Sequence, residues 1–241
     1  GFLASGRIDD RRVWTSAAGA YADQVAEHAL GLLLAGVRGL VAAASQQDWR
    51  PDAVAPRVTG LAGTTVAVVG AGGIGRRIVE LLVGHRVSVI AVNRSGRQVP
   101  AAESTVPASR VGEIWDRVDH VVLAAPATDA TRRLIDASVL ARLKPTSWVV
   151  NIARGSLIDT AALLDAVTDG RIAGAGLDVT DPEPLPPEHP LWTTPGILIT
   201  PHTANPGPLA RRSLAERIRQ NVARFASGQD LLGRIDPAAG Y

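Results

Sequence analysis

Short apolar runs alternate with polar segments along most of the chain. Six runs rich in β-branched and aliphatic residues predict strands, at residues 65–69, 87–92, 119–124, 147–152, 171–177 and 196–200. Helical spacing and capping residues predict helices, some preceded by loops, at residues 76–83, 111–116, 128–143, 160–168 and 208–227. This alternation predicts an α/β protein with a doubly wound parallel sheet that helices cover on both faces. Residues 96–109, which contain Pro and Ser, are expected to form a loop.

An apolar segment of helical character precedes the first strand, at residues 23–44. It holds several small residues that would let another element approach closely: Ala29, Gly31, Ala35 and Gly36. We expect this helix to pack or to dimerise. Arg38 interrupts its most apolar part, and a lipid-facing span needs about 20 apolar residues, so no membrane segment is expected. Residues 45–63 contain two prolines and are expected to be a linker.

A glycine-rich turn joins the first predicted strand to the helix that follows it. Residues 70–75, GAGGIG, fit the pattern G-x-G-x-x-G. The first glycine allows a tight turn, the second lets the backbone approach a pyrophosphate, and the third lets helix and strand pack closely. The helix N-terminus then offers free N–H groups to phosphates. Ordinary turns also use glycine, but the strand before and the helix after favour a dinucleotide site that includes Gly70, Gly72, Gly73, Ile74 and Gly75.

The end of the second predicted strand bears on the choice of cofactor. A site for NAD usually ends this strand in Asp or Glu, which bonds the ribose hydroxyls and repels a 2′-phosphate. Here the strand runs into Asn93, Arg94 and Ser95, with Arg97 nearby. A neutral amide followed by a guanidinium and a hydroxyl suits a phosphate better, so NADP(H) is favoured and NAD(H) is the alternative. The simpler interpretation is that Arg94 and Arg97 point into solvent.

Composition and charge narrow the chemistry. The chain has 241 residues, 46% of them hydrophobic, and it can bury a sizeable core. It contains no cysteine, which excludes disulfides, thiolate metal ligands and a cysteine nucleophile, and without a spaced histidine pair no metal is predicted. The formal net charge is only +2. A solvated helix face explains the densest basic group, so no nucleic-acid partner is expected. That group lies around Glu216 and comprises Arg211, Arg212, Arg217 and Arg219.

Four polar residues follow the later predicted strands. In a doubly wound sheet of order 3-2-1-4-5-6, ligands bind beyond the carboxyl ends of the strands. Strand four runs into Arg154, strand five into Asp178 and strand six into His202, and Glu183 lies in a proline-rich loop between the last two. Taken one at a time, each residue has an equally good structural interpretation. These are a surface arginine for Arg154, a helix or turn cap for Asp178, a histidine in a turn for His202 and a solvated loop charge for Glu183. Together their placement favours a site. The remaining histidines are interpreted as structural: His28, His85, His120 and His189.

The chemistry of these four side chains suits reduction of a carbonyl group by a hydride. Such a reaction needs a proton donor at the carbonyl oxygen, and a glutamate beside a histidine favours the imidazolium form. Arg154 can grip a substrate carboxylate through two parallel hydrogen bonds. Asp178 can accept a hydrogen bond from a nicotinamide carboxamide. The sequence therefore predicts a redox site beyond the strand ends.

From about Trp14 to Tyr241 the chain resembles the D-isomer-specific 2-hydroxyacid dehydrogenase family. The matching motifs are GAYA at 19–22, VAEH at 25–28, VGAGGIG at 69–75, PATDAT at 126–131, NIARG at 151–155, GLDV at 176–179, EPLP at 183–186 and TPH at 200–202. The resemblance implies hydride transfer between NADP(H) or NAD(H) and a small 2-keto or 2-hydroxy acid. It implies that Arg154 binds substrate, that Glu183 and His202 form the acid–base pair, and that Asp178 lies at the nicotinamide.

The resemblance has further consequences for contacts and assembly. It implies cofactor contacts from Ala124, Ala125, Pro126, Thr131 and Ala153, and a homodimer formed through the helix at 23–44. We expect a cytoplasmic enzyme. The substrate stays open among glyoxylate, hydroxypyruvate, pyruvate and bulkier keto acids, with phosphite as a further alternative. The alternative function is a catalytically silent protein of the same fold that senses NAD(P).

Family members also carry an N-terminal lobe of roughly 70 to 100 residues, a domain-sized piece that closes over the substrate. We therefore expect residues 1–15 to be a remnant of that lobe. Residues 16–206 are expected to form the dinucleotide-binding domain. Residues 207–241 are expected to form a C-terminal helix and tail that return toward the lobe.

Overall fold

The computed structural model describes residues 11–235 of the chain. The described residues divide into two compact units, one of residues 23–204 and a smaller one that combines residues 11–22 with residues 205–235. The predicted remnant at 1–15 therefore lies mostly outside the described residues.

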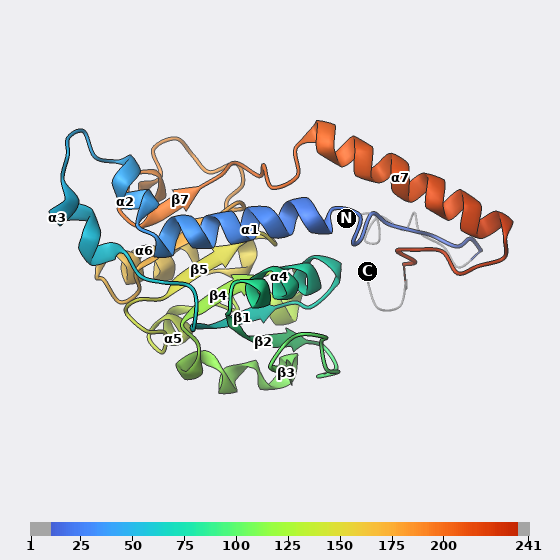
Figure 1. Cartoon of the computed structure of the whole chain (residues 1–241), viewed down its shortest axis with the longest axis horizontal. Coiled ribbons are helices and arrows are strands. Elements are labelled where there is room, and N and C mark those ends of the chain that lie inside the picture. The colour runs from blue at the N-terminus through green and yellow to red at the C-terminus, as the bar shows by residue number, and fades with distance from the viewer. Residues whose placement is uncertain (1–10, 236–241) are drawn as a thin grey trace. The chain divides into compact units, whose positions relative to one another are not determined.

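The larger unit is built on a seven-stranded sheet in which every strand pairs in parallel with its neighbour. The strands lie in the order β3-β2-β1-β4-β5-β6-β7 (Figure 1). They are β1 (Thr65–Val69), β2 (Ser88–Asn93), β3 (Ser104–Pro107), β4 (His120–Leu123), β5 (Trp148–Asn151), β6 (Gly174–Leu177) and β7 (Ile197–Ile199). The predicted α/β class with a parallel sheet is confirmed.

The prediction of a loop at residues 96–109 is wrong, because β3 lies inside it. This strand is four residues long, is only half-buried and ends in Pro107 at the sheet edge. An edge strand this short carries too little apolar alternation to be recognised. The run at 119–124 is consequently the fourth strand rather than the third, and it pairs with β1 through Val66 and His120.

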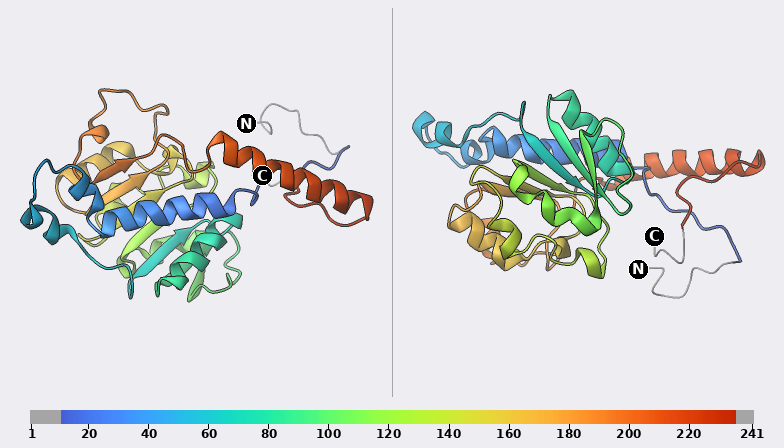
Figure 2. Two further views of the ribbon diagram at one scale, coloured as in Figure 1. Left: turned by 45° about the horizontal axis from the view of Figure 1, so that its top comes forward. Right: turned by 90° about the horizontal axis from the view of Figure 1, so that it is seen from below.

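Helices cover both faces of this sheet (Figure 2, right). One face carries α1 (Ala22–Val37) and α4 (Gly73–Gly84), joined by an ion pair of 2.7 Å between Asp23 Oδ1 and Arg77 Nε. The other face carries α5 (Ala137–Leu140) and α6 (Thr160–Thr168). Ala67 of β1, Leu140 of α5 and Leu163 of α6 share one buried cluster on that second face. The strands are buried on both sides, as a parallel sheet requires.

The predicted single helix at 23–44 is two helices, α1 and α2 (Leu40–Ala44). Gly39 separates them with φ +67°, a left-handed conformation that favours glycine. Gly36 explains part of the small-residue pattern, because a Cβ there would come within 2.2 Å of the Trp148 indole of β5. The close approach that the small residues allow is thus partly used within the chain.

Short helical segments occupy several of the connections. The predicted linker at 45–63 contains α3 (Pro51–Val54) and the 3₁₀ segment η1 (Ala55–Arg57). The helix predicted at 111–116 is instead a pair of 3₁₀ segments, η2 (Ala108–Glu113) and η3 (Trp115–Arg117). The others are η4 (Asp129–Thr131), η5 (Gly155–Leu157) and η6 (Pro190–Trp192). Within the described residues, none of the helices is both long and apolar enough to cross a membrane.

The smaller unit contains one long helix, α7 (Gly207–Ala226). The segments beside it pair with one another through an antiparallel bridge between Thr15 and Arg234 and a 2.7 Å bond from Ser16 N to Gly233 O. Arg217 of α7 donates from Nη1 to Ala18 O at 2.9 Å. These contacts tie the described N-terminal residues to the C-terminal segment within one unit.

Candidate active site

The glycine turn lies between β1 and α4, where the sequence predicts it. Gly70 has φ +100°, and a Cβ there would come within 2.4 Å of Ala125 N. A Cβ on Gly75 would come within 1.9 Å of Gly70 O. Gly72 is different, because it is the N-cap of α4 and a Cβ on it would meet nothing within 4 Å. The fold itself therefore requires glycine at positions 70 and 75. The open space beside Gly72 instead fits the approach of a dinucleotide pyrophosphate.

The segment that follows β4 lies against this turn. Ala124 N donates to Val69 O at 2.8 Å, and the backbone of Ala124 and Ala125 occupies the space that a Cβ on Gly70 would need. The Thr131 hydroxyl donates to Pro126 O at 2.7 Å and accepts from Thr128 N at 2.8 Å. Thr131 thus holds the loop after Pro126 in shape. The structure brings the predicted cofactor residues Ala124 and Ala125 to the glycine turn, and Pro126 follows them in the chain.

The loop after β2 is built around the side chain of Asn93. Its Nδ2 donates to Arg97 O at 2.7 Å, and its Oδ1 accepts from Gly96 N at 2.7 Å. Asn93 is half-buried, whereas Arg94 and Ser95 are exposed. The amide therefore fixes the loop, in which Arg97 is exposed as well and the Ser95 hydroxyl accepts from Arg97 N at 3.3 Å.

His202 and Glu183 meet in a direct hydrogen bond. His202 Nδ1 lies 2.6 Å from Glu183 Oε1, and the two side chains are 54% and 39% exposed. His202 follows β7 with φ +54°, an uncommon conformation for a residue with a side chain. A cavity of about 290 Å³ adjoins the pair and is also lined by Leu185 and Trp192. The bond at Nδ1 leaves Nε2 as the ring nitrogen that can exchange a proton with a ligand.

Asp178 is buried under the turn that carries His202. Its Oδ1 accepts from Thr200 Oγ1 at 2.7 Å and from Thr203 N at 2.8 Å, and its Oδ2 accepts from Ala204 N at 3.1 Å. Burial acts to raise the pKa of Asp178, but hydrogen bonds from His28, Thr200 and the two backbone amides outweigh it and lower the pKa to about 2. The side chain is therefore an ionised anchor of the turn.

Arg154 is placed by the turn after β5. Asn151 is fully buried, and its side chain accepts from Ala153 N at 3.0 Å and donates to Arg154 O at 2.9 Å. Gly155 then packs so closely on the loop before Glu183 that a Cβ would come within 1.9 Å of Thr180 O. The exposed Arg154 guanidinium donates from Nη1 to Ala153 O at 2.6 Å. The Arg154 turn and the Glu183 loop are thus neighbours. The Arg154 guanidinium takes no part in the hydrogen bond between His202 and Glu183.

His28 also belongs to this cluster at the strand ends, a placement that the sequence did not predict. Its Nε2 lies 2.8 Å from Thr200 Oγ1 and 3.3 Å from Asp178 Oδ1. The interpretation of His120 as structural is supported, because this residue is buried at the start of the central strand β4 and accepts from Trp148 N at 3.2 Å. His28 lies three residues after the buried Val25, on the same face of α1. This spacing was the sequence signal that could have placed His28 on the side of the helix that faces the sheet. No local sequence pattern indicates that a residue of α1 contacts the end of β7.

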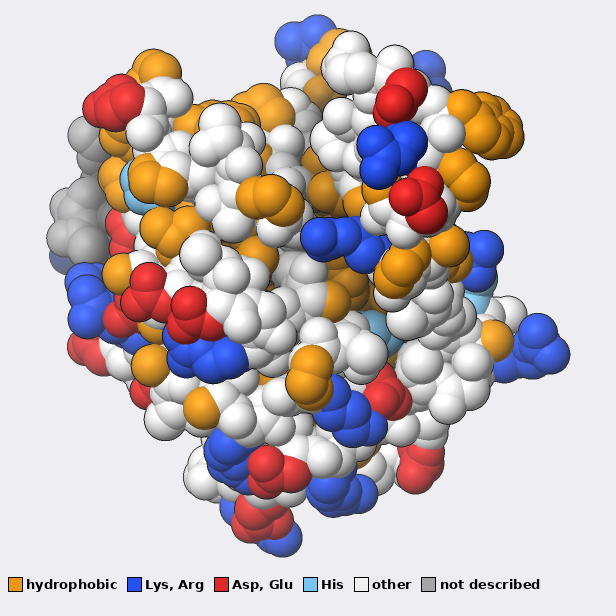
Figure 3. All heavy atoms as spheres, turned by 90° about the vertical axis from the view of Figure 1, so that its left-hand side faces the viewer, with side chains coloured by type: hydrophobic (Ala, Val, Ile, Leu, Met, Phe, Trp, Pro, Cys, Tyr) orange, Lys and Arg blue, Asp and Glu red, His pale blue; other side chains and the backbone are white. Residues whose placement is uncertain are grey.

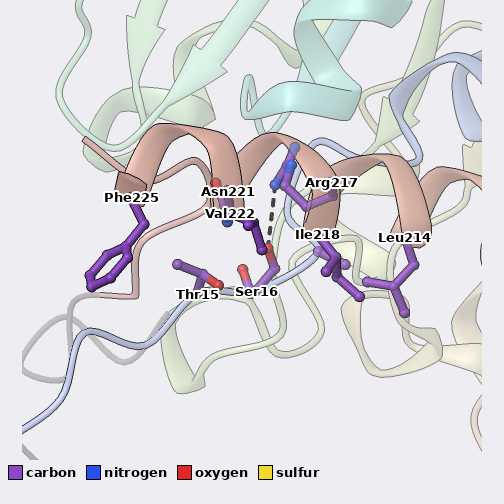
Figure 4. Close-up of a pocket in the computed structure, with 9 residues that line it drawn as sticks. Thr15, Ser16, Leu214, Arg217, Ile218, Asn221, Val222 and Phe225 are labelled. Carbon is purple, nitrogen blue, oxygen red and sulfur yellow. Dashed lines mark hydrogen bonds between the residues drawn. The ribbon is translucent and has the colours of Figure 1, made fainter. Parts of the chain in front are cut away.

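A second cavity of about 380 Å³ lies along α7 (Figure 4). Apolar side chains line it: Leu214, Ile218, Val222 and Phe225. Of its nine lining residues only Arg217 is ionisable, and this arginine also donates to Ser16 O and Ala18 O. This surface holds no acid–base pair, so the catalytic prediction rests on the His202 region.

Charge is mixed over the surface. Positive and negative side chains are interspersed on the face shown in Figure 3. In the basic group on α7, Arg219 pairs with Glu216 at 2.6 Å, and Arg217 bonds backbone carbonyls instead of being simply solvated. No group of three or more His, Cys, Asp or Glu side chains that could hold a metal ion occurs in residues 11–235.

A parallel sheet of this order, with a glycine turn after its first strand and polar residues beyond its carboxyl ends, defines a Rossmann-like dinucleotide-binding protein. The NAD binding domain of the D-isomer specific 2-hydroxyacid dehydrogenases matches residues 30–204. The chain belongs to this family, as the motifs predict. Homologues in the family are NAD(P)-dependent 2-hydroxyacid dehydrogenases and glyoxylate reductases.

Two sequence relatives are longer than the region that this chain matches. An uncharacterized protein of Corynebacterium melassecola is 42% identical over 238 residues, which are 98% of this chain and 78% of that protein. A glyoxylate reductase of Pyrococcus furiosus is 34% identical over 212 residues, 85% of this chain and 63% of that enzyme. The match thus spans less than two thirds of the archaeal relative.

Solved structures agree in fold. A D-isomer specific 2-hydroxyacid dehydrogenase from Xanthobacter autotrophicus Py2, in complex with NADPH and MES, has a TM-score of 0.82 and 29% identity, with 100% of both chains covered. An NADPH-dependent glyoxylate/hydroxypyruvate reductase from Sinorhizobium meliloti, in complex with NADP and sulfate, has a TM-score of 0.78 and 27% identity, covering 92% of this chain and 71% of that one. Structural homologues therefore bind NADP(H) or NAD(H).

Proposed function

We propose that this protein reduces small 2-keto acids to 2-hydroxy acids, or catalyses the reverse reaction, with NADP(H) as the preferred cofactor. The observation that carries the proposal is the 2.6 Å hydrogen bond between His202 and Glu183 beyond the carboxyl end of the sheet. A histidine held at one ring nitrogen by a carboxylate is suited to give and take a proton at the other. The family and its named relatives supply the substrate class.

Each side chain has a separate task in this proposal. His202 Nε2 donates a proton to the carbonyl oxygen, while Glu183 holds Nδ1–H and stabilises the imidazolium that acts as the acid. The Arg154 guanidinium leaves Ala153 O and binds the substrate carboxylate through two hydrogen bonds. When bound, the nicotinamide cofactor supplies the hydride. Asp178 keeps the His202 turn in place and offers Oδ2 to the carboxamide.

Turnover with a panel of 2-keto acids and NADPH tests the proposal. His202→Ala should lower kcat by roughly 10²- to 10⁴-fold, because it removes the proton donor. NADPH binding should persist, since the glycine turn is untouched. His85→Ala is the matched control, because His85 is exposed at the end of α4 and its ring Nδ1 bonds the backbone oxygen of Leu81. NADPH binding without turnover of any substrate would favour the silent sensor instead.

The preference for NADP(H) rests on the loop after β2. Asn93 is occupied within the loop, no carboxylate ends the strand, and Arg94 and Ser95 are exposed. A difference titration should show NADPH binding about tenfold more tightly than NADH or better, since one charge-assisted phosphate contact is worth about 1.5–3 kcal/mol. Arg94→Ser should weaken NADPH binding alone, and Arg171→Ser, in the turn between α6 and β6, should change neither. Tighter binding of NADH would contradict this preference.

We also propose a homodimer. Leu40 of α2 is 56% exposed and Trp49, just before α3, is 93% exposed. Large apolar side chains left exposed support an interface that would bury them. Sedimentation of the chain and of Trp49→Ser would show a dimer that the substitution weakens, and a monomer at high concentration would contradict it.

A further inference from the structure

A chain of hydrogen bonds joins α1 to the turn that carries His202. Thr200 Oγ1 donates its proton to Asp178 Oδ1 at 2.7 Å. The Thr200 oxygen is therefore the acceptor in its 2.8 Å contact with His28, and His28 Nε2–H is the donor. His28 Nε2 also lies 3.3 Å from Asp178 Oδ1. The hydrogen bonds thus fix the ring of His28 as a donor aimed at the Thr200–Asp178 pair.

Asp178 passes this constraint to the backbone of the turn. Its carboxylate accepts from Thr203 N and Ala204 N, and its own carbonyl oxygen accepts from His202 N at 2.8 Å. His202 stands between these bonds in a left-handed conformation, with φ +54°. A residue with a side chain holds that conformation only where its surroundings enforce it. The Asp178 bonds are the surroundings that the structure shows on both sides of His202.

We propose that His28 is a positioning residue for His202, acting through Thr200 and Asp178 to hold the imidazole against Glu183. The inference rests on the proposed function, because it assigns a role in the same proton transfer. The polar partners of His28 Nε2 are Thr200 and Asp178, so its effect on His202 passes through the turn. Its side chain is 23% exposed, and an apolar residue would fill the same place on α1 without supplying the donor.

Two substitutions separate the donor from the bulk of the side chain. His28→Gln retains an N–H at nearly the reach of Nε2, whereas His28→Leu keeps apolar volume and removes the donor. His28→Leu should lower kcat for the best 2-keto acid by about tenfold, the worth of one hydrogen bond, with KM and the NADPH dissociation constant within about threefold. His28→Gln should recover most of the rate. His85→Leu, at the exposed end of α4, is the control and should change nothing.

Amide hydrogen exchange gives a readout that does not depend on activity. The amides of Thr203 and Ala204 should exchange about tenfold faster in His28→Leu than in the unsubstituted chain or in His28→Gln, since their acceptor is no longer fixed. The amide of Val68 in β1 should keep its protection in all three proteins. These rates are measured by NMR on the full chain.

The outcomes are distinct. Unchanged exchange at Thr203 and Ala204 in His28→Leu, or an equal defect in both His28 variants, would overturn the inference. Loss of protection at Val68 or of NADPH binding together with kcat would make His28 a packing residue and would overturn it too. If the unsubstituted chain reduces no 2-keto acid, the proposed function fails, while the exchange rates still decide whether His28 holds the turn.

Discussion

Apolar residues recur at helical spacing in both units, but they are buried in the larger unit and exposed in the smaller one. In α1, of the larger unit, the apolar residues recur at helical spacing and are buried, with Leu33 and Val37 fully inaccessible. In α7, of the smaller unit, Leu214, Ile218, Val222 and Phe225 also recur along one face, yet no residue of the helix is buried and Phe225 is 77% exposed. An amphipathic pattern predicts that a helix has a face to cover, but only the structure shows whether the cover lies within the described residues.

The difference also separates where chemistry and stability come from. The glycine turn, the Asn93 loop and the His202–Glu183 pair all lie in the larger unit, whose core is complete on both faces of the sheet. Full burial of one large apolar side chain stabilises a protein by about 1.5–3 kcal/mol. The apolar face of α7 is largely exposed and therefore gains little of this stabilisation. Substitutions in the two units should therefore differ strongly in cost, and three measurements test this.

The largest effect is expected at Gly36 in the larger unit. Gly36→Ala places a methyl group within 2.2 Å of the Trp148 ring, and overpacking of this kind costs about 1–3 kcal/mol or more. Gly31→Ala is the matched control in the same helix, because nothing lies within 4 Å of its Cβ, and it should stabilise α1 by roughly 0.5–1 kcal/mol. Urea unfolding gives both free energies. Equal effects of the two substitutions would show that α1 does not pack tightly on β5.

The second effect is a pH dependence of stability that originates in the same core. Burial is the main cause that lowers the pKa of His120 from 6.5 to about 4, with Asp119 opposing the shift and Lys144 adding to it. Above pH 6.5 the ring is neutral in both folded and unfolded states. Below that pH the unfolded chain takes up the proton first, so stability falls as the pH falls toward 4, by about 2–3 kcal/mol at pH 4.5.

His120→Asn isolates this contribution. The asparagine Oδ1 keeps an acceptor for Trp148 N and cannot titrate. The free energy of unfolding should therefore change by about 2–3 kcal/mol less between pH 7.5 and 4.5 in His120→Asn than in the unsubstituted chain. An identical pH dependence in both proteins would mean that His120 is accessible enough to be protonated in the folded state.

The comparison also explains what the sequence could and could not predict. The long buried runs of β1 and β2 and the glycine turn between them follow from local pattern alone, and so do the strand-end residues Arg154, Asp178 and His202. The edge strand β3 is too short and too exposed to give a pattern. The break at Gly39 depends on a single left-handed residue within an otherwise continuous apolar segment.

Local sequence patterns could not predict the long-range contacts of the candidate site. Thr200 and Asp178 are close to His202 along the chain or across neighbouring strands, but His28 is 172 residues away from Thr200. Its contact exists because α1 lies across β5 and β6, where Leu32 packs on Gly176. Hydrophobic periodicity predicts that such a helix has a buried face, but it does not predict the strand on which that face lies.

The smallest effect is expected on α7. Phe225→Ser should change the free energy of unfolding by less than about 0.5 kcal/mol, because the ring is mostly exposed and its loss removes little buried area. Leu33→Ala, measured alongside as the buried reference, should cost about 2–5 kcal/mol. A cost for Phe225→Ser close to that of Leu33→Ala would show that the apolar face of α7 is covered in solution. If that cost grew with protein concentration, the cover would come from a second copy of the chain, because only association makes stability depend on concentration.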